Sequence, residues 1–190
     1  MNVYQWYNSE IKSKIIQDCM DNVKSRTLFM SKNTYTLIPV DHKKFDIKVQ
    51  ARSESDVLRC KILSEDPDGE WFDTDCEIIN EFVPPKDGKP YFSQGLIGRA
   101  NGDVIIANSN TQFFKDLLDA FDKLPESGRN PGWMQALLRV NQDKIGLIPT
   151  GYYRHFCLCH TSHLSDGQSM SVNGAILQMV NGELSVIHRS

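Results

Sequence analysis

The sequence lacks any segment that would carry the chain into a membrane. It contains no run approaching the roughly 18 apolar residues of a spanning helix. Glu10, Lys12 and Lys14 interrupt the N-terminal region, where a secretory signal peptide needs an unbroken apolar stretch. These absences predict a cytoplasmic protein that makes no membrane contact.

Cysteine is scarce and unevenly spaced. The five cysteines stand at positions 19, 60, 76, 157 and 159. An odd number without regular spacing does not match a secreted disulfide framework. We therefore expect reduced thiols, which agrees with a cytoplasmic location.

Positive charge is not in excess. Lys and Arg together number 21 against 24 Asp and Glu, and the formal net charge is −3. A molecule of this sign does not attract phosphate backbones over long range, and the basic residues form no dense patch. We therefore expect no nucleic acid partner.

The common nucleotide-binding and catalytic motifs are also missing. The segment Gly95-Leu96-Ile97-Gly98 lacks both the third glycine of a dinucleotide fingerprint and the lysine of a P-loop. The chain has no G-x-S-x-G and no H-E-x-x-H pattern. No catalytic machinery can be identified on this basis, so a protein that is not an enzyme is favoured, although the question stays open.

What is present is the composition of an ordinary folded protein. Hydrophobic residues make up 40% of the 190 residues and charged residues 24%, which is close to the average for folded soluble chains. We expect a single domain over 1–190, and the Pro- and Gly-rich loop at 83–99 is the candidate for an internal boundary.

The spacing of apolar residues predicts an α+β fold, with a mainly antiparallel sheet and about three helices packed on it. The helices are expected over 9–24, from Ser109 or Asn110 to just before Pro125, and from Pro131 to about Val140. Turn chemistry at 66–69 predicts a hairpin between two of the strands. The strands are expected over 34–38, 45–52, 57–63, 71–79, 104–107, 152–159, 169–172, 175–180 and 183–188.

An acidic stretch at 65–81 contains no Lys or Arg. On a single strand, Asp73, Asp75 and Glu77 would share one face and form a negative stripe that could engage a basic protein surface. Trp71, Tyr91 and Phe92 lie near turns, where aromatic side chains can anchor a binding surface. We predict these six residues as a partner-binding surface; a solvated hairpin face and aromatic residues that fill the edge of the core are the alternatives.

The segment 155–163 gathers three histidines and two cysteines. Thiolate and imidazole ligands suit tetrahedral zinc, and we name Cys157, Cys159, His160 and His163 as candidate zinc ligands. The cysteines could instead be small buried hydrophobic residues, or one of them could be a nucleophile with a histidine as its base.

The function that we predict from these observations is protein binding. With no catalytic motif, an acidic stripe and a long loop, the chain is expected to act on a protein partner in an accessory or inhibitory role, of the kind that phages and mobile elements encode. The alternative is a zinc-dependent or thiol-dependent hydrolase that uses the cluster at 155–163. No cofactor is expected other than zinc.

Overall fold

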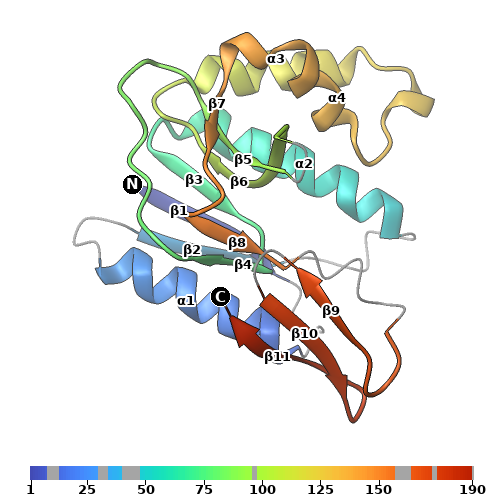
Figure 1. Ribbon diagram of the computed structural model, residues 1–190. Helices are drawn as coiled ribbons and strands as arrows, with labels where there is room; N and C mark the ends of the chain where they lie inside the picture. Colours follow the sequence, from blue (N-terminus) through green and yellow to red (C-terminus); the bar gives the residue numbers. More distant parts are fainter. Residues whose placement is uncertain are drawn as a thin grey trace.

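A six-stranded mixed sheet forms the centre of the computed structural model (Figure 1). The structure describes residues 1–7, 13–29, 34–39, 48–95, 98–156, 164–172 and 175–189. The strand order is β2-β1-β3-β6-β5-β7. In that order the strands are Thr34–Pro39, Asn2–Tyr7, Gly69–Phe72, Ala100–Ile106, Tyr91–Gln94 and Gly146–Ile148.

Helices cover both faces of this sheet. Helix α1 (Lys14–Phe29) lies on one face, and α2 (Lys48–Glu65), α3 (Thr111–Asp122) and α4 (Trp133–Val140) lie on the opposite face (Figure 1). Two single 3₁₀ turns, Glu126–Gly128 and Gln142–Lys144, flank α4. Helix α3 begins where the Asn110 side chain accepts a hydrogen bond from the Phe113 amide (3.1 Å), which is the expected chemistry of an N-cap.

In the N-terminal half, the two connections between parallel strands lie on opposite faces of the sheet, and β1 lies between β2 and β3. Strands β2 and β3 both run parallel to β1, one on each side of it. Helix α1 connects β1 to β2 on one face, and α2 connects β2 to β3 on the other (Figure 1). In open α/β sheets such a reversal leaves a crevice beyond the carboxyl ends of the two central strands, where ligands bind. Here that position is the carboxyl ends of β1 and β3.

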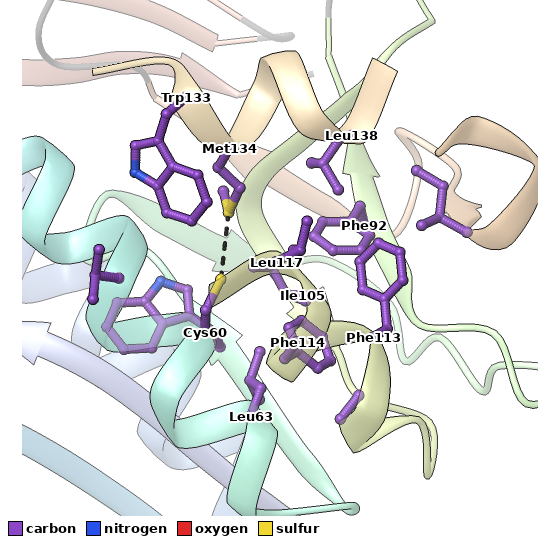
Figure 2. Close-up of a cluster of buried hydrophobic side chains, with 14 residues drawn as sticks. Cys60, Leu63, Phe92, Ile105, Phe113, Phe114, Leu117, Trp133, Met134 and Leu138 are labelled. Atoms are coloured by element: carbon purple, nitrogen blue, oxygen red, sulfur yellow. Dashed lines mark hydrogen bonds between the residues drawn. The ribbon is translucent and has the colours of Figure 1, made fainter. Parts of the chain in front are cut away.

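Two hydrophobic clusters result from the alternation of side chains along the strands. Trp71, Phe92 and Ile105 belong to a cluster of buried residues that also includes residues of α2, α3 and α4. Figure 2 shows Phe92 and Ile105 within this cluster. Phe72 and Val104 point to the opposite face and join a second cluster that includes Val23 of α1. The central strands of the main sheet are therefore buried on both faces, whereas the edge strand β2 is largely exposed.

The remaining strands form two small antiparallel sheets. Strand β4 (Cys76–Ile78) pairs with β8 (Tyr153–His155). Strands β9 (Ser169–Val172), β10 (Ala175–Val180) and β11 (Glu183–Arg189) form a three-stranded sheet. Ile15 and Cys19 of α1 pack against Ala175 and Leu177 of this sheet, so that α1 is covered on both sides.

The predicted α+β class is confirmed, but two of its details are corrected. The main sheet is mixed rather than mainly antiparallel, and the described residues form four α-helices rather than about three. Within the described part, no helix combines the length and the apolar character needed to cross a membrane. The expectation of a single domain stays a prediction.

The strands predicted at 45–52 and 57–63 are wrong, because residues 48–65 form helix α2; positions 45–47 lie outside the described residues. Val57, Cys60 and Leu63 recur every third residue and are all buried on one side of this helix. Asp56 and Arg59 are buried beside them, and these charged residues obscured the helical pattern.

The single strand predicted at 71–79 is also wrong, since β3 ends at Phe72 and β4 begins at Cys76. The turn at 66–69 is present, but it joins α2 to β3 instead of closing a hairpin. The loop predicted at 83–99 contains β5, and β1 and β7 were not predicted. The elements predicted from 104 to 140 and from 169 to 188 are confirmed as β6, α3, α4, β9, β10 and β11.

Candidate metal centre

The candidate site begins where β3 ends, at the carboxyl edge of the parallel strands. Asp73 follows Phe72 directly, Thr74 and Asp75 form a turn, and Cys76 opens β4. The Cys76 amide donates a hydrogen bond to the Asp73 carbonyl oxygen (3.0 Å) and closes the turn. Two carboxylates are thus held at the position where this type of sheet binds ligands.

The pairing of β3 with β6 brings a third carboxylate to the turn. Phe72 stands opposite Val104, so Asp73 and Asp103, one residue further along, are neighbours. The Asp73 amide donates to the Asp103 carbonyl oxygen at 2.7 Å. The Asp103 carboxylate in turn accepts a hydrogen bond from Nδ2 of Asn101 (2.7 Å), which fixes its orientation.

Strand β8 supplies an imidazole between these carboxylates. His155 stands opposite Cys76 in the pairing of β8 with β4. Its Nδ1 lies 2.7 Å from Oδ2 of Asp103, and its Nε2 lies 3.1 Å from Oδ1 of Asp75. Burial lowers the pKa of His155, but the hydrogen bonds to Asp103 and Asp75 outweigh it and raise the pKa to about 12. We call Asp73, Asp75, Asp103 and His155 the carboxylate–imidazole cluster.

Asp73 is anchored from the side of α2. Its Oδ1 accepts a hydrogen bond from Nε1 of Trp71 (2.8 Å) and lies 3.3 Å from Nη2 of Arg59. Burial raises the pKa of Asp73 to about 6, and the Arg59 guanidinium opposes this rise. One oxygen of the carboxylate is therefore held in place by two donors.

Arg59 is itself fixed by several contacts. Its Nη1 donates to the Gly102 carbonyl oxygen, and its Nη2 donates to Oγ of Ser55 (2.9 Å) and lies 3.3 Å from Oδ1 of Asp56. The guanidinium also lies over the Trp71 ring, 5.2 Å from its centroid. A buried Arg with this many partners is a rigid support for the Asp73 carboxylate.

The donor set of the cluster suits a hard divalent cation. Asp73, Asp103 and His155 form one set, and Asp75, Cys76 and His155 form a second; within each set the ligand atoms lie within 4.8 Å of one another. Burial raises the pKa of Cys76 well above its ordinary value, so this thiol stays neutral and is a poor ligand. The remaining carboxylate oxygens and imidazole nitrogen fit Mn²⁺ or Mg²⁺.

The other predicted partner-binding residues do not form an exposed surface. Glu77 is paired with Arg154 and lies 3.4 Å from Nε of Arg189, with its side chain only 12% exposed. Trp71 and Phe92 are fully buried and Tyr91 is nearly so. The turn after β3 separates Asp73 and Asp75 from Glu77, so the three residues share no strand face.

The predicted zinc ligands Cys157, Cys159, His160 and His163 lie outside the described residues, and that part stays a prediction. Sequence reasoning missed Asp103 and Arg59 and did not connect His155 with the aspartates. The signal that could have joined them was the Asp73-Thr74-Asp75 sequence directly after a buried strand. Because residues 71–79 were predicted to form one strand of an antiparallel hairpin, this short acidic sequence was not recognised as the end of a parallel strand.

Comparisons with known proteins support the fold and add no sequence relative. No protein-family model and no curated protein sequence matches the chain. A solved structure described as the crystal structure of a glycosyltransferase involved in the glycosylation of the major capsid of PBCV-1 is similar to it. The TM-score is 0.53 at 9% sequence identity, covering 82% of this chain and 94% of that chain.

These findings correct the predicted function. The expected protein-binding module without catalytic machinery, and its zinc or thiol hydrolase alternative, are not supported, because the fold resembles that of a glycosyltransferase. Asp73 and Asp75, two of the acidic residues chosen as a partner surface, lie in a cluster of partly buried groups.

Proposed function

We propose that this protein is a glycosyltransferase that binds the diphosphate of a nucleotide-sugar donor through a divalent cation held in the carboxylate–imidazole cluster of Asp73, Asp75, Asp103 and His155. The observation that carries the proposal is the carboxylate–imidazole cluster at the carboxyl ends of β1 and β3. The likeness of the fold to a solved glycosyltransferase supports the choice of reaction. Fold alone would not suffice, since one fold serves many reactions.

The charges of the cluster favour a cation together with an anionic substrate. Carboxylates outnumber the imidazole in the cluster, and Mg²⁺-type ions are commonly bound by one or two carboxylates together with phosphate oxygens of a substrate. Glycosyl transfer from a nucleotide-sugar breaks the bond between the anomeric carbon and a diphosphate oxygen. A bound divalent cation would supply stabilisation of the negative charge that develops on that leaving group.

The chain's own residues prepare this site in definite ways. Asp103 accepts the Nδ1 proton of His155 (2.7 Å), and Nε2 faces Asp75 (3.1 Å). Because the pKa of His155 is raised to about 12, a divalent cation would have to displace the Nε2 proton before this nitrogen could become a ligand. Carboxylates that orient a metal-binding histidine in this way are common in metal sites. Arg59 and Trp71 fix Asp73, so the donor atoms need little rearrangement.

The exposure of the cluster agrees with binding from solvent. The side chains of Asp73, Asp75 and His155 are 26%, 18% and 15% exposed. They are accessible to a ligand, yet they are shielded enough for electrostatic interactions to be stronger than in bulk water.

Turnover of donor sugars tests the proposal. Purified protein is incubated with a panel of nucleoside diphosphate sugars with and without Mn²⁺, and release of the nucleoside diphosphate is measured. We expect release from at least one donor, dependent on Mn²⁺ and lost in Asp75→Asn. The matched control is Asp119→Asn, an exposed aspartate on α3, which is expected to retain wild-type rates. Absence of Mn²⁺-dependent release from every donor, or full activity of Asp75→Asn, would contradict the proposal.

A further inference from the structure

A second site lies on the face of the main sheet that α1 covers, away from Trp71 and Arg59. A cavity of about 180 Å³, partly open to solvent, is lined by β1, β3 and β6, by the segment from Ile78 to Pro84, and by Tyr152 and Tyr153. Its lining is mainly apolar, with Phe72, Phe82 and Ile106 among the walls. A cavity of roughly 150 Å³ can hold a benzene-sized molecule, so this one has room for a small organic ligand.

Of the two acidic residues in this lining, Glu81 is exposed and only Glu70 is buried. It stands in the middle of β3, is 6% exposed, and its neighbour Trp71 faces the opposite cluster. In the described part of the chain, neither a hydrogen bond nor an ion pair joins the Glu70 carboxyl group to another residue. Burying such a group without a partner costs several kcal/mol, and an aliphatic residue here would complete the surrounding cluster of Val3, Phe72 and Ile106.

Among the described residues, the charges around Glu70 do not form an ion pair with it. Burial raises the pKa of Glu70 to about 8, the amino group of Met1 lowers it, and Glu81 raises it. The carboxyl group therefore keeps its proton near neutral pH and would release it when an organic cation binds beside it, and the two acidic residues of the lining disfavour phosphate and carboxylate ligands.

Aromatic rings line the same cavity. Phe82 and Tyr152 form an edge-to-face pair with ring centroids 5.1 Å apart, and Phe72 and Tyr153 also contribute to the lining. Aromatic faces attract organic cations, most strongly where water is excluded. The cavity therefore suits a small ligand that has both an apolar part and a positively charged group.

We propose that this cavity binds a small organic ammonium ion, with the ammonium group against Glu70 and the apolar part against Phe72, Phe82 and Tyr152. The site is independent of the carboxylate–imidazole cluster, because Glu70 makes no contact with it and points to the other face of β3. If the cavity does not bind an organic ammonium ion, the proposed glycosyl transfer is unaffected. If the protein does not transfer a sugar, the proposal for the cavity is likewise unaffected.

Binding of benzylamine, compared with neutral benzyl alcohol, tests the proposal. Methyl NMR spectra of the full chain follow Val104 and Ile106, which line the cavity. We expect benzylamine to shift these methyl signals and to bind at least about tenfold more tightly than benzyl alcohol, because the alcohol does not form the ion pair. Glu70→Gln should remove this preference while benzyl alcohol still binds, which also shows that the cavity is intact.

A second variant keeps the test informative if Glu70→Gln does not fold. Phe82→Leu removes one aromatic face from a half-buried side chain and should weaken benzylamine more than benzyl alcohol. Glu183→Gln, an exposed position on β11, serves as the matched control and should bind as the wild type does. Equal affinity of the wild type for the two probes, or no benzylamine-induced shift of these methyl groups, overturns the proposal.

Discussion

Replacing Glu70 with Gln alters the dependence of stability on pH in a direction that the structure fixes. The pKa of this carboxyl group is raised from 4.5 to about 8, mainly by burial. The folded state therefore holds the proton more tightly than the unfolded chain does. For such a group, stability is fully present below the unfolded pKa and is lost as the pH rises toward the folded pKa.

The magnitude follows from the interval between the two pKa values. One pKa unit corresponds to about 1.4 kcal/mol, so linkage at Glu70 lowers the free energy of unfolding by about 2.5 kcal/mol between pH 5 and pH 7. Gln has nearly the same shape and does not titrate, so the variant does not lose this stability. Other buried acids, such as Asp73, titrate in both proteins and cancel in the comparison.

Urea denaturation of wild type and Glu70→Gln at pH 5 and pH 7 gives the four free energies required. We expect the variant to gain about 2.5 kcal/mol relative to wild type on going from pH 5 to pH 7. The exposed control Glu183→Gln should follow the wild type. If Glu70→Gln and wild type change in parallel, within about 0.5 kcal/mol, Glu70 is not buried in the way described and the reasoning is refuted.

Two further substitutions test the packing around the site and the sheet, again by urea denaturation. Arg59→Met should lower the free energy of unfolding by about 3 to 5 kcal/mol, because Asp56 loses its cation while remaining buried and the partly exposed Asp73 loses the same partner; a loss below about 1 kcal/mol would contradict the described network. Gly146→Ala should cost about 1 to 3 kcal/mol, because its Cβ would overlap the ring of Tyr91. Gly151→Ala, whose Cβ would meet nothing nearby, should change stability by less than about 0.5 kcal/mol, and equal effects of the two alanines would refute the packing of β7 against β5.

The sequence predicts most accurately where local chemistry and hydrophobic pattern agree. Helix α3 has an Asn cap and an apolar stripe with Phe113, Phe114 and Leu117 buried, and both signals were readable. Two Asn-Gly pairs, at 173–174 and 181–182, separate the strands of the C-terminal sheet, and an Asp-Gly pair at 166–167 precedes them; such pairs are strong turn signals. These elements depend little on distant parts of the chain.

Helix α2 shows why other elements could not be predicted. The side that it buries combines apolar residues with Asp56 and Arg59, and those two charges are acceptable there because they pair with each other and with Asp73. Part of the charge compensation of Arg59 comes from Asp73, which lies after the helix in the sequence and contacts it only in the folded protein. A pattern that counts apolar residues therefore underestimates the helix.

The candidate site depends even more on long-range structure. Asp73 and Asp75 attracted attention as acidic residues, but their role depends on β3 lying parallel to β1 and ending at the crevice. Asp103 and His155 reach them through pairings with strands far along the sequence. Because the region was interpreted as an antiparallel hairpin, the same carboxylates were placed on a solvated face.

Calorimetric titration of Mn²⁺ into the protein, followed by UDP or GDP, tests the central claim most directly. The account predicts one Mn²⁺ per chain and nucleoside diphosphate binding that requires Mn²⁺. Both should be lost in Asp75→Asn and retained in Asp119→Asn. The account is contradicted if Mn²⁺ does not bind at millimolar concentration, or if Asp75→Asn binds it as tightly as the wild type.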